Sequence, residues 1–182
     1  MQKALIILAN GFEEIEAIAT IDILRRSGVN VTIAGLDSVQ IASARLVKIF
    51  TDKILTSNDL NYDALILPGG ANGAKNLAAS ALVKQIINKM FNEKKLIAAI
   101  CASPAEVLAP TGILNNKSAT GYPGDEALFN KSTKVKTDKV VIDGNIITSQ
   151  GPGTAADFSF AIVNYLVGKE ISDKVKKAML FV

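Results

Sequence analysis

The sequence contains no histidine, no tryptophan and only one cysteine, Cys101. Without histidine, the chain cannot build a Ser-His-Asp triad, a Cys-His dyad or a histidine metal site. A single cysteine excludes an internal disulfide, a CxxC redox pair and a cysteine-rich zinc cluster. We therefore expect no metal site, and any chemistry at Cys101 needs another group to carry the proton.

The sequence also lacks the features of nucleic-acid-binding and membrane proteins. The net charge is only +3, and the 3 Tyr and 7 Phe do not interleave with a basic block, so we expect no nucleic-acid partner. No apolar run approaches the ~18 residues of a membrane span. The first run, Ala4 to Ala9, is shorter than the apolar core of a signal peptide. These absences predict a soluble cytoplasmic protein with no membrane partner.

What the sequence does contain is a regular alternation of short apolar runs and amphipathic segments. The runs at 4–9, 29–34, 63–67, 96–100 and 145–149 predict strands, and the segments around 13–26, 73–78, 81–92, 155–167 and 171–180 predict helices. This order predicts one α/β domain over residues 1–182, with a doubly wound, mostly parallel sheet and helices on both faces. Residues 39–55 predict short strands or a hairpin at the sheet margin.

Cys101 stands at the point where a buried strand changes into a helical segment. The apolar run Leu96 to Ile100 ends at Cys101, small residues follow, and a helical pattern begins at Pro104. A tight turn of this kind lifts its central side chain out of the sheet edge. The start of a helix also favours a thiolate. The sequence therefore makes Cys101 a candidate nucleophile.

Two further chain breaks are expected to meet Cys101. Gly11 to Glu16 follows the first strand, and Pro68-Gly69-Gly70 follows the strand at 63–67. The carboxyl ends of parallel strands lie at one edge of a sheet, where ligands bind. Carboxylates, backbone amides and a thiol would then share one pocket, in which a carboxyl group could move the proton and the amides could hold an oxyanion.

Each of these features also has a purely structural interpretation. A lone cysteine is most often a small buried hydrophobic residue. Acidic residues at a helix start complement the helix dipole, and glycines after a strand often make only a turn. The combination of all three at one sheet edge favours a functional site over these separate explanations.

Four ordered motifs make the sequence resemble the ThiJ/PfpI superfamily, a branch of the flavodoxin-like, class I glutamine amidotransferase-like fold. The resemblance is greatest to the Parkinson-disease-associated protein deglycase branch and covers about residues 3 to 178. The motifs lie at 4–16, 67–70, 96–104 and 148–154. The resemblance implies a homodimer without a metal or organic cofactor. It also implies glutathione-independent conversion of methylglyoxal to a hydroxy acid, or deglycation of early glyoxal adducts on proteins.

The resemblance also implies roles for individual residues. Cys101 matches the family's oxidisable nucleophile, and Glu16 matches the glutamate whose protonated carboxyl bonds the sulfur. Three positions match the backbone amides around the oxyanion site: Gly69, Gly70 and Ala102. Two others look like the arginines that approach the site near the dimer interface: Arg26 and Arg45.

Two departures from the family pattern limit the chemistry. The protease-like branch has a histidine directly after the cysteine, where this chain has Ala102, so a peptidase is excluded. Many deglycase relatives have a histidine where this chain has Tyr122, whose usual pKa of ~10 prevents it from acting as a base at neutral pH. Glu16 would then carry the proton transfers while Tyr122 orients the substrate. The alternative function is an oxidative-stress sensor or redox chaperone that acts through oxidation of Cys101.

Overall fold

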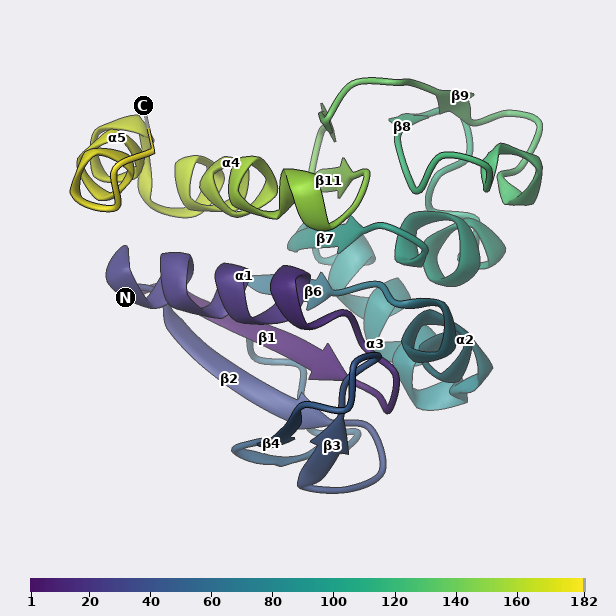
Figure 1. Ribbon diagram of the computed structural model, residues 1–182. Helices are drawn as coiled ribbons and strands as arrows, with labels where there is room; N and C mark the ends of the chain where they lie inside the picture. Colours follow the sequence, from purple (N-terminus) through teal and green to yellow (C-terminus); the bar gives the residue numbers. More distant parts are fainter. Residues whose placement is uncertain (182) are drawn as a thin grey trace.

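The computed structural model, which describes residues 1–181, is a seven-stranded sheet covered by helices on both faces (Figure 1). The strand order is β10-β11-β7-β6-β1-β2-β5, and every pair is parallel except β10 with β11. The strands of the sheet are β1 (Lys3–Leu8), β2 (Asn30–Gly35), β5 (Lys53–Ile54), β6 (Ala64–Leu67), β7 (Leu96–Ile100), β10 (Val140–Asp143) and β11 (Ile146–Ser149). The predicted α/β fold with a mostly parallel sheet is confirmed.

Two short strand pairs lie outside this sheet. β3 (Gln40–Ala42) and β4 (Lys48–Phe50) form an antiparallel hairpin, and β8 (Ser118–Ala119) pairs in parallel with β9 (Lys134–Val135). The hairpin follows β2 and lies below the main sheet in the view of Figure 1. Short strands at the sheet margin were the expectation for residues 39–55, and the hairpin confirms it.

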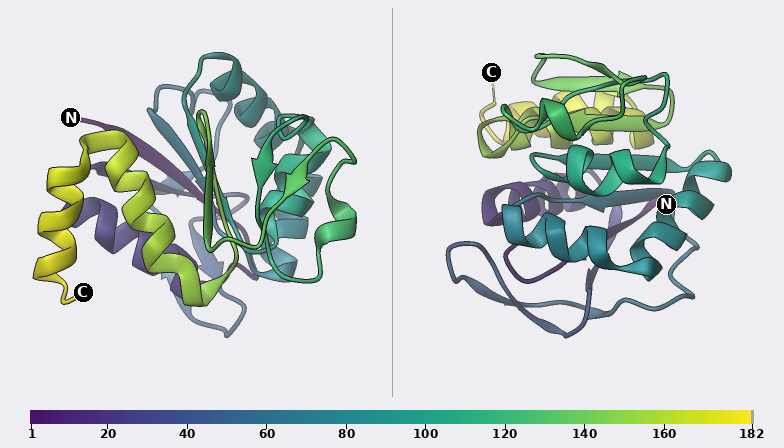
Figure 2. Two further views of the ribbon diagram at one scale, coloured as in Figure 1. Left: turned by 90° about the horizontal axis from the view of Figure 1, so that it is seen from above. Right: turned by 90° about the vertical axis from the view of Figure 1, so that its right-hand side faces the viewer.

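Five α-helices cover the two faces of the sheet. They are α1 (Glu14–Arg26), α2 (Ala71–Ala79), α3 (Ala81–Asn92), α4 (Ala155–Val167) and α5 (Lys169–Ala178). α1 and α4 pack on one face, with α5 against α4, and α2 and α3 pack on the other face. Figure 2 (left) shows these two groups on opposite sides of the strands.

The core follows from the side-chain alternation of the central strands. In β1, Leu5 and Ile7 point into the cluster under α2 and α3, whereas Ile6 and Leu8 point into the cluster under α1 and α4. These side chains are fully buried, because a central parallel strand is covered on both faces. The continuous apolar run at the start of the sequence therefore marks the centre of the sheet.

The strand order reverses on either side of β1. The chain leaves β1 for β2 on one side and later returns to β6 on the other side. Such a reversal opens a crevice at the carboxyl ends of the two neighbouring strands. The segments Asn10–Glu13 and Pro68–Gly70 follow β1 and β6 and therefore lie beside this crevice.

The apolar stripe of α1 is only partly used by the core. Ile21 and Leu24 are buried, but Ile15 is 55% exposed and Ile18 is 45% exposed. Figure 1 shows α1 running alongside β1. This part of the stripe is left uncovered within the chain.

The segment after Cys101 is helical, but it is not an ordinary α-helix. Residues Pro104–Leu108 form a π-helical turn, and Ala109–Thr111 continue it as a 3₁₀ turn. Pro104 stands at the first position of this segment, where a missing N–H costs no helical hydrogen bond. π-helical turns are rare and frequently occur at functional sites.

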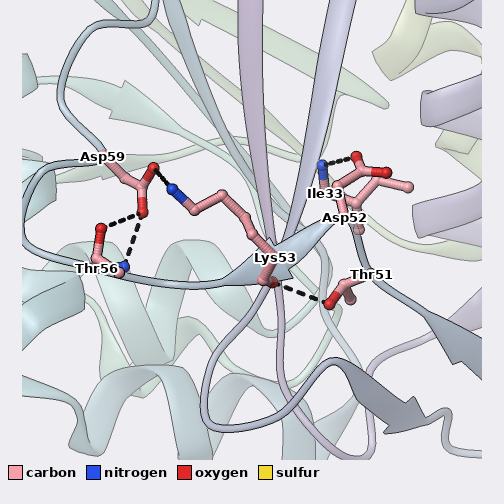
Figure 3. A network of polar contacts seen from close by, with 6 residues as sticks. All are labelled: Ile33, Thr51, Asp52, Lys53, Thr56 and Asp59. Atoms are coloured by element: carbon pink, nitrogen blue, oxygen red, sulfur yellow. Dashed lines mark hydrogen bonds and ion pairs between the residues drawn. The ribbon is translucent and has the colours of Figure 1, made fainter.

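A network around Asp59 holds the edge strand β5 in place (Figure 3). The buried Asp59 carboxylate accepts hydrogen bonds from Lys53 Nζ at 2.6 Å and from the backbone N–H of Thr56 at 2.7 Å. Burial alone would raise the pKa of Asp59, but the bonds from Lys53 and Thr56 outweigh burial and lower the pKa. The ionised carboxylate is therefore the form that stabilises this edge.

We expect Asp59→Ala to lower the free energy of unfolding at pH 7 by about 2–3 kcal/mol, because it leaves the half-buried Lys53 ammonium and the Thr56 N–H without their acceptor. The exposed Lys169–Asp173 pair provides a control, and Asp173→Ala should cost no more than about 0.5 kcal/mol. Urea unfolding measures both values. Since the folded-state pKa of Asp59 is lowered, the effect should diminish as the pH falls through that pKa. Equal losses in the two variants at pH 7 would contradict the role of the network.

Candidate active site around Cys101

Cys101 occupies a strained turn directly after β7. Its φ angle is 66°, in the left-handed region that residues other than glycine rarely adopt. Two backbone hydrogen bonds hold the turn: the Cys101 N–H donates to the Ser149 carbonyl at 3.0 Å, and the Tyr122 N–H donates to the Cys101 carbonyl at 2.8 Å. Strain of this kind persists only where the surrounding structure fixes it, and it clusters at functional sites. The geometry is that of a nucleophile elbow.

The three predicted loops meet at this turn. The Glu13 N–H donates to the Gly69 carbonyl at 3.0 Å, which ties the loop after β1 to the loop after β6. The hydroxyl of Ser103 donates to the Pro68 carbonyl at 2.6 Å, which ties the turn after β7 to the same loop. The loops pack so tightly at Gly70, with φ at 86°, that an added Cβ would lie 2.3 Å from the Gly11 carbonyl oxygen.

Glu16 places a fully buried carboxyl beside the Cys101 sulfur. Glu13 caps α1 by accepting the Glu16 N–H at 2.8 Å, and this cap fixes the first turn of the helix, which carries Glu16. One carboxyl oxygen, Oε2, accepts the Gly69 N–H at 2.7 Å. The other, Oε1, has no hydrogen-bond partner among residues 1–181. An unpartnered buried oxygen is costly, so this arrangement favours a protonated carboxyl or a bound ligand.

The pKa values of the pair are both raised. Burial raises the pKa of the Glu16 carboxyl from 4.5 to about 7, although the Gly69 N–H, which bonds the carboxylate, and the nearby Cys101 thiol reduce the rise. Burial, followed by the negative charge of Glu16, raises the pKa of the Cys101 thiol to about 12. Protonation of Glu16 removes the negative charge that opposes the thiolate. The titrations of the two groups are therefore coupled, and the charge of one opposes ionisation of the other.

The helix dipole does not determine the state of Cys101, contrary to the expectation from the sequence. The turn after Cys101 is short and π-helical, and burial together with Glu16 opposes ionisation. Two backbone amides act in the opposite direction, because the N–H groups of Gly70 and Ala102 lie near the sulfur and lower the pKa of the thiol. The fraction of Cys101 present as thiolate therefore depends on whether Glu16 is protonated.

A pocket of about 570 Å³ opens in front of the sulfur. Cys101, Gly70 and Ala102 form its floor, and Tyr122, which is 51% exposed, contributes to its wall. The remaining lining residues are Glu13, Ala44, Arg45, Ala71, Lys75, Glu106, Asp125 and Pro152. The volume suits a small organic molecule, and a nucleophile, amide donors and charged groups all reach it.

Comparison with known proteins identifies the family. The DJ-1/PfpI family matches residues 2–165. The Parkinson disease protein 7 homolog of Danio rerio is 40% identical over 98% of this chain and 97% of its own length. The chain belongs to the DJ-1/PfpI family.

Other DJ-1/PfpI relatives resemble the chain over its length. The crystal structure of Drosophila melanogaster DJ-1beta superposes with a TM-score of 0.94, at 40% identity, over 100% of this chain and 98% of that one. A Caenorhabditis elegans protein named glutathione-independent glyoxalase DJR-1.2 is 34% identical over 98% of this chain and 96% of its own length. The chain spans only 41% of protein DJ-1 homolog B of Arabidopsis thaliana, at 39% identity.

Two residues predicted from the family resemblance lie elsewhere or act differently. Arg26 pairs with Asp22 at 2.8 Å and lines a separate cavity with α5. It lies ten residues along α1 from Glu16, about 15 Å at the rise of an α-helix, so it does not reach the pocket of its own chain, and its approach to the site near a dimer interface stays a prediction. Gly69 was expected to serve the oxyanion site, but its N–H bonds the Glu16 carboxyl instead. Arg45 does line the pocket, as predicted.

Sequence reasoning missed three charged residues of the pocket: Lys75, Glu106 and Asp125. Glu106 was visible as the one charge in the apolar stretch after Cys101, on the segment that follows the elbow. Asp125 and Lys75 come from distant segments, and only the fold brings them to the sulfur.

Residues 1–181 contain no group of three or more cysteine, aspartate or glutamate side chains arranged to hold a metal ion. Over the same residues, no helix combines the length and the apolar character that crossing a membrane requires. The expectations of no cofactor and of a cytoplasmic location stay predictions.

Glu16→Gln should stabilise the protein above neutral pH. The folded-state pKa of Glu16 is raised to about 7, so the wild type loses stability as the pH rises from about 4.5 to 7 and then levels off. An uncharged glutamine avoids the unfavourable free energy of burying a carboxylate. The free energy of unfolding at pH 8 should therefore rise by roughly 2–3 kcal/mol in the variant, with little change at pH 4.5.

Denaturant unfolding at the two pH values measures this effect, with exposed Glu93→Gln as the control that should show no such difference. A Glu16→Gln variant that is less stable than the wild type at pH 8 would contradict the raised pKa.

Proposed function

We propose that this protein is a cysteine-dependent enzyme that converts small 2-oxoaldehydes, such as methylglyoxal, to 2-hydroxy acids without glutathione. The observation that carries the proposal is the buried carboxyl of Glu16, with its free Oε1, beside the only thiol of the chain at the floor of a pocket. The name of the C. elegans relative, glutathione-independent glyoxalase, supports the same chemistry.

The first step joins the sulfur to the aldehyde carbon. Glu16, when ionised, takes the proton of the Cys101 thiol, and the sulfur adds to the aldehyde C=O. The C–S bond forms, the carbonyl π bond breaks, and the oxygen receives the proton, which gives a hemithioacetal. The amides of Gly70 and Ala102, which already face the sulfur, lie where negative charge develops on that oxygen.

The second step moves hydrogen between adjacent carbons. Glu16 removes the proton from the carbon bonded to sulfur, an enediol forms, and the proton returns to the neighbouring carbon. The first carbon is thereby oxidised to a thioester and the second is reduced to an alcohol, so no external oxidant is needed. Water then hydrolyses the thioester and releases the 2-hydroxy acid and the thiol. A carboxyl with a pKa near 7 suits both proton transfers.

The pocket wall orients the substrate in this proposal. Tyr122 carries its hydroxyl on a half-exposed ring beside the sulfur and can donate a hydrogen bond to the ketone oxygen. Arg45 also lines the pocket and is a cation available to the carboxylate of the product. Early glyoxal adducts on proteins release the same aldehydes reversibly, so a protein deglycase activity rests on the same two steps.

We expect the wild type to form lactate from methylglyoxal without glutathione. Cys101→Ser and Glu16→Gln should each lower kcat/KM by about 10²-fold or more, because each removes a group that forms or breaks a bond. The value of kcat/KM should rise through about pH 7 as Glu16 ionises. Glu93→Gln, at the far end of the sheet, is the control. Full turnover by Glu16→Gln would overturn the proposal.

A sensor that acts through oxidation of Cys101 is the second candidate. The thiol sits in a strained turn and, although it is only 7% exposed, it lines the pocket through which peroxide would reach it. The raised pKa of Cys101 opposes this function, because the thiolate is the form that oxidises. Mass spectrometry after mild peroxide separates the two: oxidised Cys101 without any methylglyoxal turnover supports the sensor, and an unmodified Cys101 excludes it.

We also propose that the protein is a homodimer. The uncovered side chains Ile15 and Ile18 of α1 lie close to Leu46 and Val47 of the turn between β3 and β4, because the Ala44 N–H bonds the Phe12 carbonyl at 2.7 Å. An exposed apolar surface of this kind is typical of an interface between subunits. Sedimentation equilibrium should give the mass of two chains, and Ile18→Glu should shift it toward one. A single-chain mass for the wild type would contradict this proposal.

A further inference from the structure

The pocket in front of Cys101 has two walls of opposite charge. Arg45, from the turn between β3 and β4, and Lys75, from α2, form one wall. Glu106, from the π-helical turn, and Asp125, from the loop after β8, form the other. The two carboxylates come from different segments, and the fold brings them together at the mouth of the site.

The acidic wall has no partner within the chain. The ion pairs of residues 1–181 lie elsewhere, and neither the Glu106 nor the Asp125 carboxylate accepts a hydrogen bond from any of these residues. Asp125 faces further carboxylates instead: burial, then the charges of Glu106 and Glu126, raise the pKa of Asp125. Like charges that converge without a counter-ion are unfavourable, and a bound cation would relieve this repulsion.

The carboxylates that line the pocket are less exposed to solvent than its two cations. Glu106 and Asp125 are half-buried, whereas Arg45 and Lys75 are exposed. Solvent and salt screen exposed charges more strongly than partly buried ones. Glu13, another half-buried carboxylate of the lining, adds to the negative side. A positively charged molecule is therefore attracted toward the sulfur, and a negatively charged one is repelled.

We propose that Glu106 and Asp125 select the carbonyl compounds that reach Cys101 by charge, favouring those that carry a cationic group and disfavouring anionic ones. This inference rests on the proposed function for its substrate class, a carbonyl compound. The step that it governs is the addition of the thiol across the C=O: the C–S bond forms, the carbonyl π bond breaks, the thiol proton moves to oxygen, and nothing is oxidised or reduced.

The single cysteine allows a direct test that needs no turnover. Three thiol reagents of one chemistry are compared: methyl methanethiosulfonate, and ethyl methanethiosulfonates that carry either a trimethylammonium or a sulfonate group. The rate ratio of the cationic to the anionic reagent at Cys101 is divided by the same ratio for 2-mercaptoethanol. The neutral reagent reports changes in the thiol itself.

We expect the wild-type ratio to exceed that of 2-mercaptoethanol by about tenfold, and Glu106→Gln and Asp125→Asn each to lower it by about three- to tenfold. Lys75→Gln should raise it. Glu93→Gln removes the same charge at the opposite end of the sheet and should leave it unchanged. A wild-type ratio no greater than that of the free thiol would overturn the proposal. A ratio that neither Glu106→Gln nor Asp125→Asn changes, or that Glu93→Gln changes equally, would overturn it as well.

A second measurement addresses substrates. Trimethylammonioacetaldehyde and glyoxylate are small aldehydes of opposite charge, and both can form a hemithioacetal with Cys101. Trimethylammonioacetaldehyde should inhibit methylglyoxal turnover at a concentration about tenfold below that of glyoxylate. Glu106→Gln should reduce this difference between the two inhibitory concentrations. Stronger inhibition by glyoxylate would contradict the proposal. Absence of methylglyoxal turnover in the wild type would contradict the proposed function, but the rate ratios of the thiol reagents would still test charge selection at Cys101. Failure of the proposed function and failure of this proposal are therefore distinguishable.

Discussion

The hydrogen bond between the Gly69 N–H and the buried Glu16 carboxyl is the contact on which the site depends. It joins the first turn of α1 to the loop after β6, and it leaves the other carboxyl oxygen free beside the sulfur. The contact is possible because Gly69 has no side chain: a Cβ there would lie 2.5 Å from the Cys101 Cβ and 2.9 Å from Glu16 Oε2. In the proposed reaction, a carboxyl held in this way, away from water, takes the acid–base role that histidine has in many cysteine enzymes.

The burial of these two groups also lowers the stability of the folded chain. Burial penalises the ionised form of Glu16 and the thiolate form of Cys101, and the backbone at Cys101 is strained. A doubly wound sheet can carry such a cost because its core is large: β1, β6 and β7 are buried on both faces directly beneath the site. The favourable free energy of burying these strands thus offsets the unfavourable free energy of the strained turn and the buried carboxyl at the strand ends.

The sequence was sufficient to predict the features that depend on local pattern. The apolar run from Leu96 to Ile100 predicted β7, and its abrupt end predicted the turn at Cys101. The chain breaks after β1 and β6 predicted that Glu16 and Gly70 would meet the cysteine, because parallel strands end at one sheet edge.

Features that depend on packing between distant segments were not predictable. The exposure of Ile18 depends on which side of α1 is covered by the sheet and by α4, and the meeting of Glu106 with Asp125 depends on the path of the loop after β8. The distance of Arg26 from the pocket of its own chain, by contrast, follows from helix geometry alone.

In the proposed reaction, the Cys101 sulfur bonds the aldehyde carbon and Glu16 then moves the proton between carbons. The most direct test is carbon-13 NMR of methylglyoxal labelled at the aldehyde carbon, mixed with Glu16→Gln protein at a pH where the thiolate forms. A hemithioacetal signal that persists without conversion to product, and that is absent in Cys101→Ala protein, is the predicted result. Rapid formation of lactate by Glu16→Gln protein, or an identical spectrum from Cys101→Ala protein, would contradict this mechanism.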